Sequence, residues 1–230
     1  MQRNRFFNFC IGHLSKKLSV ILVVLVIVLF YTFMVTAALL YPGDYDFITM
    51  SISALGNPDK NPFPGWIFFS LAVSWISIAI FPLYLRACRQ LKQYNKVLVE
   101  IMLVFCAISS GGLFLLGCFS ERHATEIMHY IAAGMAFGGL FMAAIFWWIL
   151  LGKYLKATNQ CGKTPAMIIF IVMIATLMGS IVGLATSQII ASSSSFQDIS
   201  LWFLIFGFWE WTSVTAINIQ LFLLSVIVPA

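Results

Sequence analysis

A short polar segment lies between two apolar runs near the middle of the chain, and its residue types are suited to acid–base chemistry. The segment reads CFSERHATEIMHYIAAGMAF (residues 118–137) and holds two of the three histidines in a chain that is only 9% charged. His129 follows Glu126 by three residues, so both lie on one face of a helix, and His123 can fold back over them. A histidine and a carboxylate can act as base and orienting group beside a lipid ester. The candidate catalytic residues are therefore His129, Glu126 and His123.

The same residue types also bind zinc, but their spacing matches no strong zinc signature, because neither HExxH nor a CxxC pair occurs. We therefore assign no metal and no cofactor. The structural alternative is that His129 packs at the start of a helix and that the other charged residues are solvated loop side chains.

A second candidate is Glu210, which lies in the run FWEWTS near the end of the chain. Its position is about ten residues into an apolar run, or about 15 Å deep at about 1.5 Å per residue. A carboxylate in hydrocarbon costs several kcal/mol unless it is paired, protonated or hydrated. Glu210, with Ser213 one turn further along, is therefore expected to bind a proton or a ligand in a central cavity. The alternative is a protonated acid that hydrogen-bonds a neighbouring helix for packing.

A third group of polar residues occurs in the segment YPGDYDFITMSISALGNPDKNPFPG (residues 41–65). Apolar residues at 48, 52 and 55 recur at helical spacing, which predicts a short helix on the membrane surface, although the alternation over 49–53 also permits an extended strand. Three prolines make the second half a turn or loop. The segment is either an interfacial connector or a flap over a cavity. With Glu210 and Ser213, its polar residues complete the candidate ligand-binding set: Asp44, Asp46, Ser51, Ser53 and Asn57.

These candidates must be positioned by membrane helices, because the chain is 61% hydrophobic. Crossing about 30 Å of hydrocarbon takes a helix of about 18 or more apolar residues. Six such runs occupy about 18–40, 65–85, 97–118, 127–151, 165–187 and 200–228, which predicts an all-α bundle of six transmembrane helices in a single domain, 1–230. The first run resembles a signal peptide in its basic flank but exceeds the usual core of about 7–15 residues, so we interpret it as a retained span. Gly134 and Gly138 form a small-xxx-small pair that predicts close helix packing.

The basic residues predict how the bundle is oriented. Three alternate segments hold eleven of the thirteen Lys and Arg residues, and such segments face the cytoplasm. Both termini are therefore expected in the cytoplasm, and segment 41–65 is expected to form a structured extracytoplasmic loop on the cell membrane. The net charge of +5 reflects this bias, and we expect no nucleic-acid partner because no basic stripe stands outside these loops.

Two stretches carry a resemblance to a known family. The segment SISALGNPDKNPFPGWIFFS, followed by a span that ends in a basic turn, and the segment MHYIAAGMAF resemble the six-span DRAM/FRAG-like membrane proteins and their bacterial and archaeal relatives of unknown function. The resemblance implies a six-helix bundle with cytoplasmic termini. It also implies a link to lipid handling, since eukaryotic members act in remodelling of GPI-anchored proteins and in lipid distribution between leaflets. Carried onto this chain, it emphasises Ser51, Ser53, Gly56, Asn57 and His129.

Our leading functional hypothesis is a multi-pass protein of lipid handling that binds a lipid or amphiphile in a cavity open to the outer leaflet. One alternative is a membrane-embedded lipid-modifying hydrolase or transferase that uses His129 and Glu126. Another is a proton-coupled transporter of small molecules that uses Glu210. We expect membrane lipids as partners and allow for a homo-oligomer.

Overall fold

The computed structural model describes residues 12–119, 125–159 and 206–227, together with isolated positions between 168 and 186. Most of these residues are helical, and no strand occurs among them. The helices are α2 (Lys16–Leu39), α3 (Ile52–Leu55), α4 (Gly65–Leu91), α5 (Lys96–Cys118), α6 (Glu126–Ala133), the π-helix η1 (Gly134–Gly138), α7 (Gly139–Ala157) and α9 (Phe206–Ile227). The expected span at 165–187 lies outside the described residues, apart from the isolated positions.

Five helical runs are long and apolar enough to cross a membrane. They are α2, α4, α5, the continuous run Glu126–Ala157 formed by α6, η1 and α7, and the part of α9 from Gly207 to Ile227. The chain is therefore a multi-pass membrane protein. Five of the six predicted runs correspond to these helices. The span predicted at 165–187 and the orientation of the bundle stay predictions.

Polar side chains fix where two of the long helices begin. The Ser15 hydroxyl accepts a hydrogen bond from the Leu18 N–H at 3.2 Å, at the start of α2. The Asn95 side-chain oxygen accepts one from the Leu98 N–H at 3.0 Å, at the start of α5. Each of these caps satisfies one of the N–H groups that a helix leaves unpaired in its first turn.

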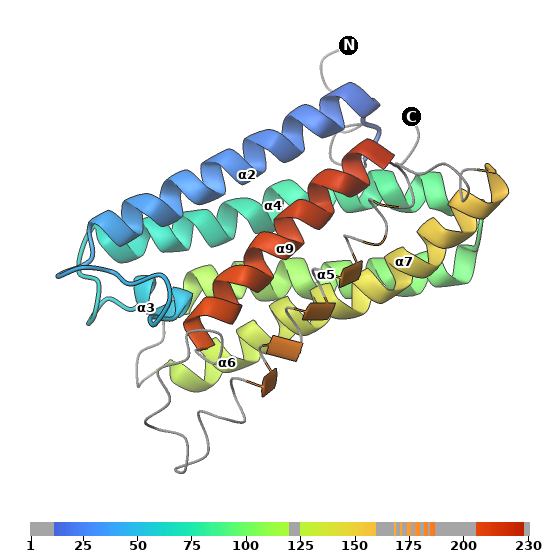
Figure 1. Ribbon diagram of the computed structural model, residues 1–230. Helices are drawn as coiled ribbons and strands as arrows, with labels where there is room; N and C mark the ends of the chain where they lie inside the picture. The colour runs from blue at the N-terminus through green and yellow to red at the C-terminus, as the bar shows by residue number, and fades with distance from the viewer. Residues whose placement is uncertain are drawn as a thin grey trace.

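The long helices run side by side as a bundle (Figure 1). Helix α4 packs against α2 on one side and α5 on the other, α5 packs against α7, and α9 packs against α2. Helix α3 and the starts of α6 and α9 lie at one end of the bundle, which we call the α3 end. The start of α2, the α4–α5 turn and the end of α7 lie at the opposite end, which we call the far end (Figure 1).

Helices α5 and α7 approach each other closely through glycines. A Cβ atom at Gly112 would collide with the backbone of Ala136, and one at Gly139 would lie 2.8 Å from the Ser109 backbone nitrogen. No described atom lies within 4 Å of a Cβ atom at Gly134 or Gly138, so the contact between α5 and α7 does not use this pair, and its predicted role in packing stays a prediction. Both glycines belong to the π-helix η1.

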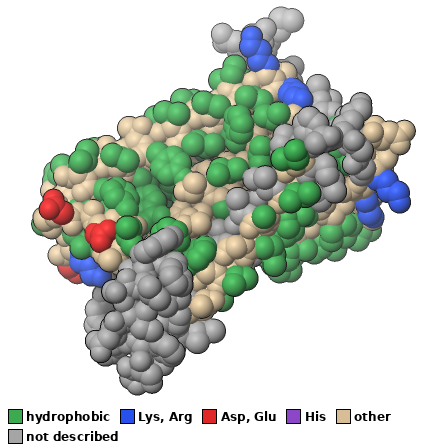
Figure 2. Space-filling view, in the orientation of Figure 1, with side chains coloured by type: hydrophobic (Ala, Val, Ile, Leu, Met, Phe, Trp, Pro, Cys, Tyr) green, Lys and Arg blue, Asp and Glu red, His purple; other side chains and the backbone are tan. Residues whose placement is uncertain are grey.

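Charged side chains gather at the two ends of the bundle. Asp44, Asp46 and Asp59 are in the connector between α2 and α4 (residues 40–64) at the α3 end. On the visible face, acidic side chains lie at the α3 end and most basic side chains lie at the far end (Figure 2). The long sides between the two ends are largely apolar, as a surface in contact with lipid tails must be.

Candidate functional site

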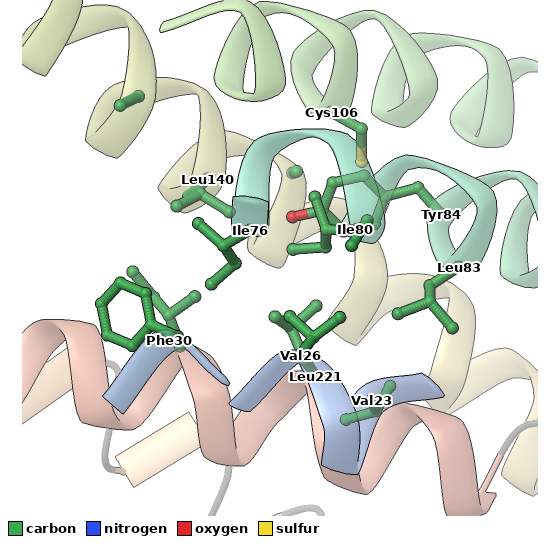
Figure 3. Packing of buried hydrophobic residues seen from close by; sticks show 14 of the residues in the cluster. Val23, Val26, Phe30, Ile76, Ile80, Leu83, Tyr84, Cys106, Leu140 and Leu221 are labelled. Atoms are coloured by element: carbon green, nitrogen blue, oxygen red, sulfur yellow. The ribbon is translucent and has the colours of Figure 1, made fainter. Parts of the chain in front are cut away.

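A cavity occupies the middle of the bundle towards the α3 end. It encloses about 680 Å³ of space between protein atoms, including its opening. Helices α2 to α7 and α9 all contribute to its wall, which is mostly apolar; Figure 3 shows Phe30, Ile76, Ile80 and Leu140, which all line it. Four residues bring polar side chains to this wall: Ser53, His129, Glu210 and Asn218. We call this space the central cavity.

Glu210 joins the connector to α9. Its Oε2 accepts a hydrogen bond of 2.7 Å from the Ile52 N–H, the first of helix α3. The residue before it, Ser51, occupies the N-cap position without a side-chain cap, and its hydroxyl instead accepts a hydrogen bond from the Ser53 hydroxyl at 3.0 Å. A carboxylate 158 positions later in the chain therefore takes over the role of the local cap. This contact explains how an acid is held at that depth.

Two neighbours of Glu210 on α9 complete the attachment of the connector. The Trp211 indole N–H donates to the Tyr45 hydroxyl at 3.2 Å, and that hydroxyl donates to the Ser51 carbonyl at 2.9 Å. Gly207 lies one turn earlier, where a Cβ atom would come within 2.5 Å of the Met50 carbonyl oxygen. Residues 207, 210 and 211 share one face of α9, so this face is the docking surface for the connector.

Burial raises the pKa of Tyr45 well above its usual value, and the negative charge of Glu210 acts in the same direction, whereas the hydrogen bond from Trp211 acts against both. The Tyr45 hydroxyl therefore stays protonated, which keeps it a donor to the Ser51 carbonyl.

Asn61 attaches the other half of the connector. Its side chain is completely buried, and its Nδ2 donates to the Leu55 carbonyl at 2.9 Å and to the Ala37 carbonyl at 3.1 Å. It thereby satisfies acceptors at the ends of both α3 and α2. Asn57, which is also buried, accepts a hydrogen bond from the Asp59 N–H at 2.9 Å and closes the intervening turn. The connector is thus a packed structure rather than a loose loop.

His129 reaches the central cavity from α6. Its side chain is only 4% exposed, and its Nδ1 lies 2.9 Å from the Phe119 carbonyl oxygen. A carbonyl oxygen can only accept, so this contact places a proton on Nδ1. Nε2 is then the ring atom that can accept a hydrogen bond from a ligand or, in the imidazolium form, donate one.

The other predicted residues are distributed more widely. Glu126 accepts a hydrogen bond from the Tyr130 hydroxyl at 3.0 Å and does not belong to the described wall of the central cavity. Asp44 and Asp46 are exposed on the connector, and Ser213 is fully buried, with no hydrogen-bond partner for its hydroxyl among the described residues. His123 lies outside the described residues.

Sequence reasoning did not single out Tyr45, Asn61 or Trp211, although they hold the connector in place. Asparagine and tyrosine in a proline-rich loop carry no signal of burial, and Trp211 was read as part of an apolar span. Asn218 also lines the central cavity, and an amide within an apolar span does not by itself indicate a site.

Comparison with known proteins gives a single finding. A family model described as "Protein of unknown function (DUF998)" matches residues 24–227. No curated protein and no solved structure matches the chain. The match does not confirm the resemblance to DRAM/FRAG-like proteins.

Proposed function

We propose a function from the geometry of the chain itself, because the chain belongs to the DUF998 family, whose function is unknown. In this proposal it binds a membrane lipid or another amphiphile in the central cavity. The observation that carries the proposal is a cavity of about 680 Å³ with apolar walls and with Ser53, His129 and Glu210 among its lining residues.

The composition of the cavity supports this reading. Small-molecule sites combine mostly apolar walls with a few polar groups that fix orientation. Ser53 is next to Ile52, whose N–H donates to Glu210, and His129 lies in the first turn of α6. The side chains of Ser53, His129 and Glu210 therefore belong to the α3 end. The α2 and α4 residues that line the cavity are apolar. The polar head of an amphiphile would lie at the α3 end and its apolar tail between the helices.

The distribution of charge supports an orientation. Lys16, Lys17, Arg89 and Lys156 belong to helix termini at the far end, and basic segments are retained in the cytoplasm. We propose that the far end and both termini face the cytoplasm. The central cavity would then receive its ligand from the outer leaflet, and the connector would cover its polar end.

The contacts of His129 and Glu126 favour binding over hydrolysis. An enzyme of the kind considered above needs the Glu126 carboxylate to orient the imidazole. The structure instead gives Nδ1 of His129 a backbone carbonyl and gives Glu126 the hydroxyl of Tyr130.

Native mass spectrometry of protein purified from its own membrane tests the proposal, with Val73→Phe as the decisive variant. Val73 lines the central cavity and is 5% exposed, so a phenylalanine there fills the space that the tail would use. Val104→Phe is the matched control, because the same change falls on a side chain of α5 that is 57% exposed. We expect a bound lipid on the wild type and on Val104→Phe and its loss from Val73→Phe.

Two results would contradict the proposal. Equal lipid retention by both valine variants would show that lipid adheres to the outer surface rather than the cavity. Stoichiometric zinc in the same sample, together with activity on a lipid ester that His129→Ala abolishes, would favour the enzyme instead.

A further inference from the structure

Two smaller cavities continue the central cavity towards the far end. The second cavity shares Leu140 and Ile217 with the central one, and the third shares Tyr84, Trp147 and Leu221 with the second. The third cavity is also lined by Arg86, Ser19 and Ser225, which belong to the far ends of α4, α2 and α9. The three cavities therefore form a row between helices that runs from Glu210 to Arg86.

Each cavity in this row is lined by at least one residue whose buried polar atom has no hydrogen-bond partner within the described part of the chain. The atoms are Asn218 Oδ1 in the central cavity, Gln220 Nε2 in the second, and Tyr84 Oη in both the second and the third. These three side chains are 2–6% exposed. A buried polar atom without a partner destabilises the folded protein, and in most proteins an ordered water supplies the missing hydrogen bond.

The space available fits water. A water molecule needs a volume of roughly 10–15 Å³ in which its centre can move. The corresponding volumes are about 70 Å³ in the central cavity, about 10 Å³ in the second and about 20 Å³ in the third. The two small cavities each match one water, and the central cavity has room for several.

We propose that water in the second and third cavities links the central cavity to the far end, so that Glu210 exchanges protons with the solution at Arg86 through Asn218, Gln220 and Tyr84. Tyr84 and Gln220 position the waters: the phenol can donate or accept, and the amide N–H donates. A proton enters the first water at the far end, and each water releases one on its other side. The carboxylate of Glu210 gains the proton that the far solution loses and then releases it to the solution at the α3 end, so that the path carries a net flux.

Charged and titratable groups near the row of cavities affect how fast protons move along it. Arg86 is buried at the far end, where its Nε donates to the Leu14 carbonyl at 3.2 Å. A fixed guanidinium repels an arriving proton, as it does in water-selective pores, so Arg86 makes the path slow. At the other end, the titratable groups near Glu210 in the described chain are Tyr45, which the charge of Glu210 affects, and His129, which lines the same cavity.

Hydroxyl-radical labelling by pulsed radiolysis tests the water directly. A buried tyrosine is oxidised in such an experiment when a bound water lies beside it. Tyr84 lines two cavities of the row, whereas Tyr154 is also buried and packs against Tyr94 without lining any of the three. We expect Tyr84 to be oxidised several-fold more than Tyr154, and equal labelling or the reverse order would overturn the proposal.

Proton flux into proteoliposomes that contain a trapped pH-sensitive dye tests the path. With a potassium diffusion potential, we expect flux above that of empty vesicles, a several-fold decrease in Tyr84→Phe and Gln220→Met, and an increase in Arg86→Gln. Ser110→Ala is the control, since it deletes a buried hydroxyl that also has no partner among the residues described but that lines none of the three cavities.

Labelled Tyr84 without any flux, or flux that Tyr84→Phe leaves unchanged, would contradict a proton path. If Arg86→Gln does not fold, the Tyr84 and Gln220 variants still decide the question. None of these variants is expected to change lipid retention strongly, so failure of the path and failure of the amphiphile site are separable.

Discussion

At the α3 end, buried polar side chains have partners from distant parts of the chain. Glu210 accepts a hydrogen bond from the Ile52 N–H, and Asn61 donates to two backbone carbonyl oxygens. The Tyr45 hydroxyl accepts from Trp211 and donates to the Ser51 carbonyl. Between α4 and α9, the equally buried atoms Tyr84 Oη, Gln220 Nε2 and Asn218 Oδ1 have none among the described residues. The two regions differ in pairing rather than in burial.

The difference indicates two uses of buried polarity in a membrane protein. Paired groups at the α3 end attach a connector and therefore contribute to stability. The three unpaired groups line cavities, where a water molecule can supply the missing hydrogen bonds. Pairing at the α3 end is not complete, because Asn61 Oδ1 and the Ser213 hydroxyl are buried and have no partner in the described structure. Substitutions in the first region should change stability, and those in the second should change transport of water or protons.

Asn61→Leu should have the largest effect on stability. It leaves the buried Ala37 and Leu55 carbonyl oxygens without a donor, which should lower the free energy of unfolding by about 2–4 kcal/mol. Thermal or denaturant unfolding in detergent measures it. Gln220→Met is the control from the second region, with an expected change of less than about 1 kcal/mol, because its Nε2 donates to no residue in the described ranges. Equal losses in the two variants would show that pairing does not distinguish the regions.

Gly207→Ala should destabilise the attachment of the connector. The new methyl group would lie 2.5 Å from the Met50 carbonyl oxygen, and overpacking of this kind costs about 1–3 kcal/mol. Gly111→Ala is the control within α5, where no described atom lies within 4 Å of the added methyl group. It should stabilise the helix by about 0.5–1 kcal/mol, because alanine loses less backbone entropy than glycine. A loss of stability in both variants would refute the close approach of α9 and the connector.

The sequence predicted the apolar part of each described helix but not its polar ends. The run 65–85 became Gly65–Leu91, and 127–151 became the longer Glu126–Ala157, because hydropathy treats Arg86 and Lys153 as the end of a helix. In fact α4 continues through Arg86, which is buried and donates to the Leu14 carbonyl. Helix formation needs satisfied backbone groups, and a membrane sets only the apolar length.

The candidate site was predicted in part. Glu210 and His129 stood out because ionisable groups are costly in lipid, and both line the central cavity. The pairing of Glu210 with Ile52 spans 158 positions, and no local pattern in one sequence encodes such a contact. The π-turn Gly134–Gly138 was equally invisible, since its letters read as ordinary helix.

Tyr45→Phe should weaken the α3 end by a smaller amount. It removes the hydroxyl that donates to Ser51 and accepts from Trp211, at an expected cost of about 1 kcal/mol. Tyr41→Phe is the control, because it keeps the ring contact between residues 41 and 45 and leaves the Tyr45 hydroxyl in place. Thermal unfolding of both variants, followed by tryptophan fluorescence, measures the difference. Identical midpoints would contradict a role for this hydroxyl.

The smallest expected effect is at Asp46, on the exposed part of the connector. Hydrogen bonds from the Ile48 N–H and the Thr49 hydroxyl, at 2.9 Å and 2.7 Å, hold the pKa of Asp46 below its usual value. A carboxyl whose pKa is lowered by folding stabilises the folded form above its unfolded pKa, about 4, and loses that contribution as the pH falls through the folded pKa. Hydrogen exchange of the Ile48 amide should therefore show protection at neutral pH that fades in acid, and Asp46→Ala should show little protection at either pH. Protection that persists in the alanine variant would mean that the turn is held by the docked connector and not by its own carboxylate.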